Sequence, residues 1–164
     1  MAELSHEVGV AGHMSYDCDG SFAYMENMIH AFEDHYRYHL GIEMLDRIDS
    51  TADAWFATIQ RQINANRPTQ HRIGDNTVDP PTGHFIVCDG WQEILPDTRQ
   101  YHMNYGWDDA NSTWYTLDAL YGNSGPDQEI MLVYIYPMNS IGHEITGEYP
   151  QPGFPYRYFD MEAS

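Results

Sequence analysis

The spacing of apolar residues predicts that the first part of the chain is helical. Residues 1–13 have the pattern of the end of a helix, with Gly9 and Gly12 as breakers. Ser21 is placed to cap a second helix that runs to about Tyr38. Four apolar residues form a stripe at helical spacing along it: Met25, Met28, Ile29 and Phe32.

A third helix is predicted from about Ser50 to Asn66, where Arg67 and Pro68 stop it. Its apolar residues recur every four positions: Trp55, Ile59 and Ile63. The pattern then changes to β-strands, which we expect at residues 69–73, 84–91, 100–107, 113–117 and 130–136. Helices followed by antiparallel strands predict an α+β fold rather than alternating βαβ units.

The length of the chain allows one compact domain. Its 164 residues, 42% of them hydrophobic, are enough for one core. We expect the domain at residues 1–137 and an extended tail, rich in Pro and aromatic residues, at 138–164. No apolar run approaches the length of about 18–20 residues that spans a bilayer.

The charge of the chain is strongly negative. Its 25 acidic residues outnumber its seven Arg, it has no Lys, and its formal charge is −18. A surface of this sign repels phosphate backbones and anionic lipids, so neither nucleic acid nor a membrane is expected as a partner. Residues 1–10 show neither a basic flank nor an apolar core, so no signal peptide is visible.

Two neighbouring strands carry residues suited to thiol-peptidase chemistry. Residues 83–91 are Gly-His-Phe-Ile-Val-Cys-Asp-Gly-Trp, and residues 101–107 are Tyr-His-Met-Asn-Tyr-Gly-Trp. A thiol nucleophile needs an imidazole base, often oriented by an amide and shielded by aromatic rings. His84 and Asn104 can supply the first two groups if the register brings them together. The alternative is structural: a His after Gly is often a turn residue, and Trp usually packs in a core.

The order of these motifs resembles the streptopain family of papain-like cysteine peptidases. After the two strands, residues 117–120 read Leu-Asp-Ala-Leu, as the family pattern requires. Upstream features also fall in matching order: Val8-Gly9-Val10, Met14, Tyr16, Gly20-Ser21, Trp55 and Arg67-Pro68. The resemblance extends from about residue 3 to residue 136. It implies part of the papain-like fold, and a secreted bacterial origin.

The resemblance implies a role for four residues. His84 matches the catalytic histidine, and Asn104 matches the asparagine of the Asn-Trp-Gly-Trp motif that orients it. Tyr105 stands where that motif has its first Trp, and Trp107 matches the second; both are expected to line or shield the cleft. The family requires no metal and no organic cofactor. Its partner is a polypeptide substrate.

The nucleophile of the family has no counterpart in the sequence. The family places it in a Gly-Cys helix well upstream of the Val-Gly-Val helix, near which this chain begins. Cys18 lies in a turn, and Cys88 lies four residues beyond His84, about 13 Å along one strand. We therefore expect Cys88 to be a buried apolar residue. The sequence leaves open whether Cys18 and Cys88 form a disulfide.

Other polar groups are weaker candidates for a site. His35 and His39, near His30, have the i,i+4 spacing of metal ligands, without a specified third ligand. Three acidic residues could attract a cation: Asp108, Asp109 and Asp118. Asp89, before a Gly, is expected to form a turn or to support His84.

Three hypotheses follow for the whole chain. It is the histidine-bearing part of a cysteine endopeptidase that is inactive without a complementary Cys-bearing segment; or a non-enzymatic binding or assembly module derived from that fold; or a truncated gene product. The DNA upstream of Met1 would discriminate between them. Two structural expectations follow from the first: His84 and Asn104 share one face of the sheet, and His84, Tyr105 and Trp107 form an exposed apolar surface.

Overall fold

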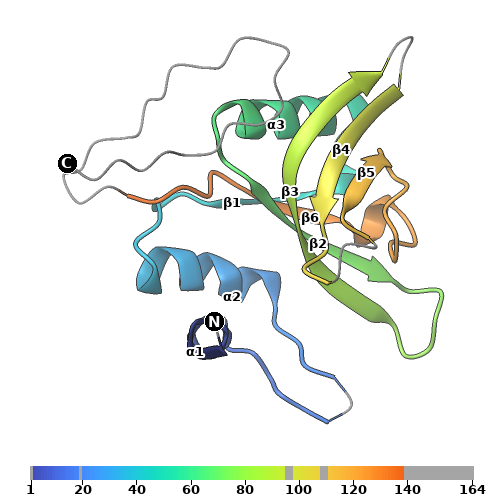
Figure 1. Ribbon diagram of the computed structural model, residues 1–164. Coiled ribbons are helices and arrows are strands. Elements are labelled where there is room, and N and C mark those ends of the chain that lie inside the picture. The colour runs from blue at the N-terminus through green and yellow to red at the C-terminus, as the bar shows by residue number, and fades with distance from the viewer. Residues whose placement is uncertain (1, 19, 95–97, 108–110, 139–164) are drawn as a thin grey trace.

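One antiparallel sheet with helices on both faces forms the body of the protein (Figure 1). This computed structural model describes residues 2–18, 20–94, 98–107 and 111–138. The helical elements are α1 (Ala2–Ala11), α2 (Met25–His30), a π-helical turn η1 (Ala31–His35), η2 (Arg47–Asp49), α3 (Ala52–Asn64) and η3 (Pro126–Gln128). None of the described helices is long and apolar enough to cross a membrane.

The sheet has six strands in the order β1-β6-β2-β3-β4-β5, and each described pair of neighbours is antiparallel. The strands are β1 (Glu43–Asp46), β2 (Thr69–Asp75), β3 (Thr82–Ile94), β4 (Thr98–Asn104), β5 (Thr113–Thr116) and β6 (Ile130–Val133). The predicted α+β class is therefore confirmed. The consecutive strands β2 to β5 form a meander, and β6 returns to pair with both β1 and β2.

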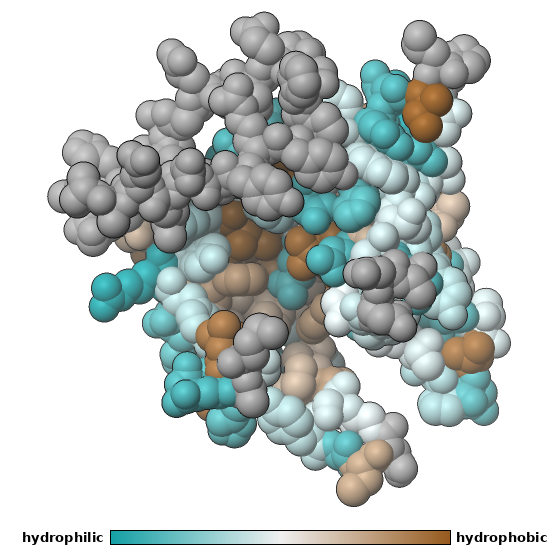
Figure 2. Space-filling view, in the orientation of Figure 1, coloured by the Kyte–Doolittle hydropathy of each residue, from teal (hydrophilic) through white to brown (hydrophobic). Residues whose placement is uncertain are grey.

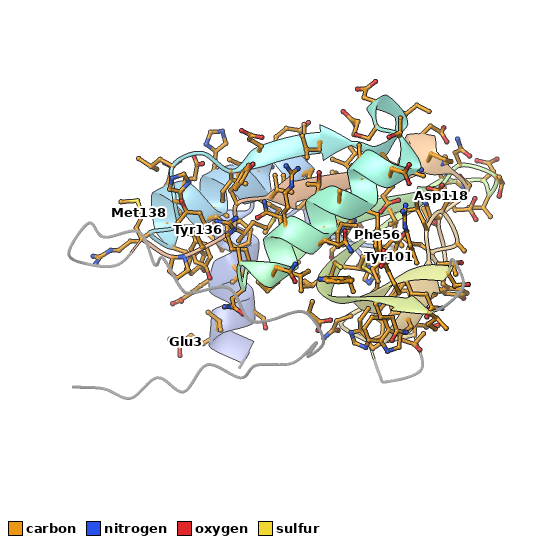
Figure 3. All side chains as sticks on the ribbon, turned by 90° about the horizontal axis from the view of Figure 1, so that it is seen from above. Glu3, Phe56, Tyr101, Asp118, Tyr136 and Met138 are labelled. Atoms are coloured by element: carbon orange, nitrogen blue, oxygen red, sulfur yellow. The ribbon has the colours of Figure 1, made fainter. Side chains whose placement is uncertain are left out.

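The main core lies between the sheet and α3, which packs against β2 and β3. Thr51 caps α3 by accepting a hydrogen bond from the Ala54 amide at 3.2 Å. The predicted stripe of α3 is buried here, and Figure 3 shows Phe56 next to Tyr101 of β4. Alternate strand residues point to this side, which we call the α3 face: Ile73, Ile86, Cys88, Tyr101, Met103, Met131 and Val133.

A second, smaller cluster covers the opposite side of the sheet, the α2 face. It contains the predicted apolar stripe, now on α2 and η1, packed on residues from β1, β3 and β6: Met44, Phe85, Ile130 and Leu132. Most members are only partly buried. Figure 2 shows apolar side chains in the hollow between α2 and the sheet. Here α2 leaves part of the apolar sheet surface uncovered.

One local prediction of secondary structure is wrong, and one strand was not predicted. Ser21 does not cap the second helix: it begins at Met25, Tyr24 precedes it without a side-chain cap, and it ends in a π-helical turn before Tyr36. The strand β1 was not predicted, because its sequence Glu-Met-Leu-Asp lacks β-branched and aromatic residues. The other predicted strands exist, with shifted ends. Of the predicted tail, residues 139–164 lie outside the described residues.

Candidate active site

His84 lies near the start of β3, opposite Ile73 of β2, with its ring partly buried. Its Nε2 atom is 2.7 Å from the main-chain carbonyl oxygen of Tyr105. Because a carbonyl oxygen can only accept a hydrogen bond, Nε2 must be the nitrogen that donates. In the neutral ring the Nδ1 atom then carries a lone pair and can accept a proton. This geometry provides an oriented base.

Aromatic rings pack along the ring of His84. Trp107 is nearly parallel to it, with 4.3 Å between the ring centroids and 25° between the planes. The ring of Tyr105 lies farther off, at 5.9 Å and 22°. Trp107 is 50% exposed, so it covers His84 while presenting an apolar surface to solvent. Tyr121, also exposed, contacts its edge. The expected exposed apolar surface is therefore present at Trp107.

Asn104 is on the strand next to His84, as predicted, but not on the same face. The register places Asn104 opposite Val87, which is three residues from His84. Because side chains alternate along a strand, an odd separation puts the two on opposite faces. The expectation of a shared face is wrong. The Asn104 Oδ1 atom instead accepts a hydrogen bond from the Gly106 amide at 2.8 Å.

Tyr105 contributes its main chain, rather than an exposed ring, to the surroundings of His84. It continues the alternation of Tyr101 and Met103, so its side chain points into the main core and is 1% exposed. Its hydroxyl donates to the Tyr121 carbonyl oxygen at 2.8 Å, and burial raises its pKa. The expectation that this ring forms part of the exposed surface is wrong. Of the rings of Tyr105 and Trp107, only that of Trp107 is exposed as expected.

The two cysteines are both free, and they occupy very different environments. Cys88 is completely buried on the α3 face, and its thiol donates to the Gly90 carbonyl oxygen at 3.6 Å. Burial raises the pKa of the Cys88 thiol to about 12. Such a group is protonated at neutral pH and is a poor nucleophile. Cys18 is exposed in the connection between α1 and α2, which extends below these helices in Figure 1.

Other polar residues singled out from the sequence, where the structure describes them, contact neighbouring side chains rather than His84. Asp89 does not support His84: it lies at a bulge in β3 and pairs with His102 across the strands at 2.5 Å. Asp118 forms an ion pair with Arg47 at 2.8 Å, while Asp108 and Asp109 lie outside the described residues. His39 stacks on Tyr136. Within the described part of the chain, no three His, Cys, Asp or Glu side chains are grouped to hold a metal ion.

Sequence reasoning missed two polar groups that the fold makes important. One is the Tyr105 carbonyl, which no side-chain motif reveals, although the alternation from Tyr101 would have predicted that the ring points inward. The other is the fully buried pair of His71 and Glu129, 3.0 Å apart, on β2 and just before β6. No sequence spacing joins residues so far apart. The first group orients His84, and the second lies in the main core.

Comparison with known sequences identifies related proteins. Residues 1–115 match the family model described as the Peptidase C10 family. Streptopain of Streptococcus pyogenes is 27% identical over 121 residues, which are 73% of this chain and 28% of streptopain. The streptopain of a serotype M28 strain is 26% identical over the same length. The chain thus spans just over a quarter of these relatives.

Comparison with solved structures identifies the fold. Active wild-type interpain A, a cysteine protease of Prevotella intermedia, matches with a TM-score of 0.66 and 21% identity. The match covers 82% of this chain and 55% of that one. A prointerpain A fragment matches with a TM-score of 0.60 and 23% identity, over 82% and 41%. The fold is therefore that of part of a papain-like cysteine protease, as predicted.

Proposed function

Because this chain belongs to the peptidase C10 family, we propose that it supplies the histidine side of a cysteine-endopeptidase site. The observation that carries the proposal is the hydrogen bond from His84 Nε2 to the Tyr105 carbonyl, which leaves Nδ1 as the basic nitrogen. A base that is oriented before the reaction avoids much of the entropy cost of aligning it. Trp107, stacked on His84, keeps water from one side of the ring.

In the proposed reaction, His84 Nδ1 takes the proton of a cysteine thiol. The thiolate attacks the carbonyl carbon of a peptide bond, and the imidazolium then gives its proton to the leaving amine. Water hydrolyses the acyl-enzyme thioester, with His84 again acting as base, and the thiol is restored. The Tyr105 carbonyl stabilises the imidazolium by accepting its Nε2–H. These steps need no metal or organic cofactor.

We further propose that the thiol comes from a complementary segment rather than from Cys18 or Cys88. Cys88 is buried, carries a raised pKa and lies on the same strand as His84. Cys18 lies in an exposed connection that lacks the Gly-Cys helix start of the family. Trp107 is half exposed, which supports the proposal that the complementary segment packs against it. A self-contained binding module would instead be expected to bury this residue.

The test is casein hydrolysis by the purified chain alone and after addition of a Cys-bearing segment. That segment is the part of a C10 relative that contains its Gly-Cys helix. Each sample is assayed with and without an irreversible thiol alkylator. We expect background turnover from the chain alone and alkylator-sensitive turnover from the mixture. The matched control is the same segment with its Cys replaced by Ala.

Two results would argue against the proposal. Alkylator-sensitive turnover by the chain alone would show that Cys18 or Cys88 is the nucleophile after all, and the Cys18→Ser and Cys88→Ala variants would identify which. Turnover of the mixture that survives the Cys→Ala control would show that the activity does not depend on the added thiol.

A further inference from the structure

We propose that Asn104 is a positioning residue that acts on His84 through the Tyr105–Gly106 peptide group, without touching the imidazole. The inference rests on the proposed function of His84 and assigns a different task to Asn104 from the direct ring contact that the family resemblance implies. It also explains why Asn104 lies on the face of the sheet opposite to His84.

The two hydrogen bonds in question meet at one planar peptide group. Gly106 N–H donates to Asn104 Oδ1 at 2.8 Å, and the Tyr105 carbonyl accepts from His84 Nε2 at 2.7 Å. These N–H and C=O groups belong to the same peptide unit, and in a trans peptide they point in opposite directions. Asn104 therefore holds the group from one side while His84 is bound at the other. Fixing the N–H fixes the direction of the carbonyl.

The local backbone is built for this arrangement. An Asn side chain that accepts from the amide two residues later forms an Asx turn. Gly106 adopts the left-handed conformation, with φ of +71°, which L-residues other than Gly rarely adopt. A β-carbon at Gly106 would meet no atom within 4 Å, so the glycine is required by its dihedral angle and not by crowding.

Ser112, just before β5, holds the same turn from a second direction. Its Oγ accepts a hydrogen bond from the Tyr105 amide at 3.3 Å and lies 3.5 Å from Asn104 Oδ1. Both amides next to the Tyr105 carbonyl are thus bound by side chains. Donation from Gly106 N–H also polarises the peptide group, which makes its carbonyl a stronger acceptor for His84.

The experiment measures solvent exchange of the His84 Nε2–H proton by NMR, on the full chain in its folded form. His84→Ala assigns the signal. We expect a protected proton in the unaltered chain and exchange about tenfold faster in Asn104→Ala, since a hydrogen bond is worth roughly that factor in an equilibrium. Asn104→Asp keeps an acceptor for Gly106 N–H, so its exchange should stay close to that of the unaltered chain.

Two further variants separate this mechanism from others. Gly106→Ala keeps every polar group but strains the turn, so it should also speed exchange; a direct contact between Asn104 and the ring would leave it unaffected. Asn111→Ala is the matched control, because it removes a carboxamide from the same connection and should change nothing. If Asn104→Ala folds poorly, the comparison of Gly106→Ala with Asn111→Ala still decides the test.

The inference is overturned if exchange is unchanged in Asn104→Ala or Gly106→Ala, if Asn104→Asp is as fast as Asn104→Ala, or if the unaltered chain shows no protected Nε2–H. None of these measurements needs a nucleophile or a substrate. A protected proton that depends on Asn104, in a chain that gains no peptidase activity with a Cys-bearing segment, would therefore refute the proposed function and leave this positioning role intact.

Discussion

At the scale of single residues, the imidazole of His84 and the thiol of Cys88 lie in environments that favour reaction in the first case and prevent it in the second. His84 is half-buried and has one nitrogen left for a proton. Cys88, on the same strand, is sealed in the core with its pKa raised to about 12. The same alternation that points Cys88 into the core places Ile86 and Met103 around it. Packing therefore explains Cys88 without any catalytic role.

The buried thiol predicts how stability depends on alkaline pH. Because the pKa of Cys88 is higher in the folded state than in the unfolded chain, the unfolded state loses its proton first. The free energy of unfolding therefore keeps its full contribution from the protonated Cys88 below the ordinary thiol pKa of about 9. It declines as the pH rises from there toward 12. Urea unfolding across this range should show a shallower decline for Cys88→Ala. Tyr101, whose pKa burial also raises, maintains part of the decline. An unchanged slope in Cys88→Ala would contradict this account.

At the scale of elements, a buried polar contact joins β2 to the segment that leads into its neighbour β6. His71 on β2 lies between Thr69, at 2.9 Å from Nε2, and Glu129, at 3.0 Å from Nδ1, and all three are buried. Glu129 directly precedes β6, which pairs with β2. The side-chain contact thus supports the long-range return of the chain from β5 to the middle of the sheet.

Removing one partner of this contact should be costly. Glu129→Ala leaves the buried His71 without its hydrogen-bond partner at Nδ1, and a buried polar group that loses its partner typically costs about 1–3 kcal/mol. We expect a decrease of this size in the free energy of unfolding, measured with urea. Glu43→Ala, which removes an exposed carboxylate from β1, is the control and should change stability by less than about 0.5 kcal/mol. Equal effects of the two variants would show that the buried pair contributes nothing special.

The sequence predicted where most elements lie, but not how their side chains meet. The apolar repeat of α3 and the β-branched content of β6 are local properties, and both elements were found. The face of Asn104 depends on its pairing with Val87, which is set by the register between two strands and which no residue of either strand encodes alone. Likewise, β4 ends at Asn104 because the chain turns at Gly106, where φ is +71°. This turn directs the Tyr105 carbonyl toward His84.

At the scale of the whole molecule, the proposed function requires an exposed apolar surface next to His84. Trp107, which stacks on the imidazole, and Tyr121, which packs against Trp107, are both about half exposed. The match covers 55% of the interpain A chain, so 45% of that structure lies outside it. With a net charge of −18, the chain should stay soluble although this apolar surface is exposed.

Binding of the Cys-bearing segment should bury Trp107. Of the four Trp residues, Trp55 is already buried in the core, whereas Trp107 is open to solvent. We therefore expect acrylamide to quench tryptophan fluorescence less strongly after the segment is added. In Trp107→Phe this change should disappear, and in Trp114→Phe, which alters a Trp of β5, it should persist. Quenching that stays constant while peptidase activity appears would place the contact elsewhere.

The most direct test of the account is the casein turnover of His84→Ala mixed with the Cys-bearing segment. His35→Ala, which removes an exposed histidine from η1, serves as its control. We predict that His84→Ala lowers alkylator-sensitive turnover by about 10²–10⁴-fold, the usual contribution of a general base, and that His35→Ala leaves it unchanged. Turnover in His84→Ala within about twofold of the His35→Ala mixture would contradict the assignment of His84 as the base.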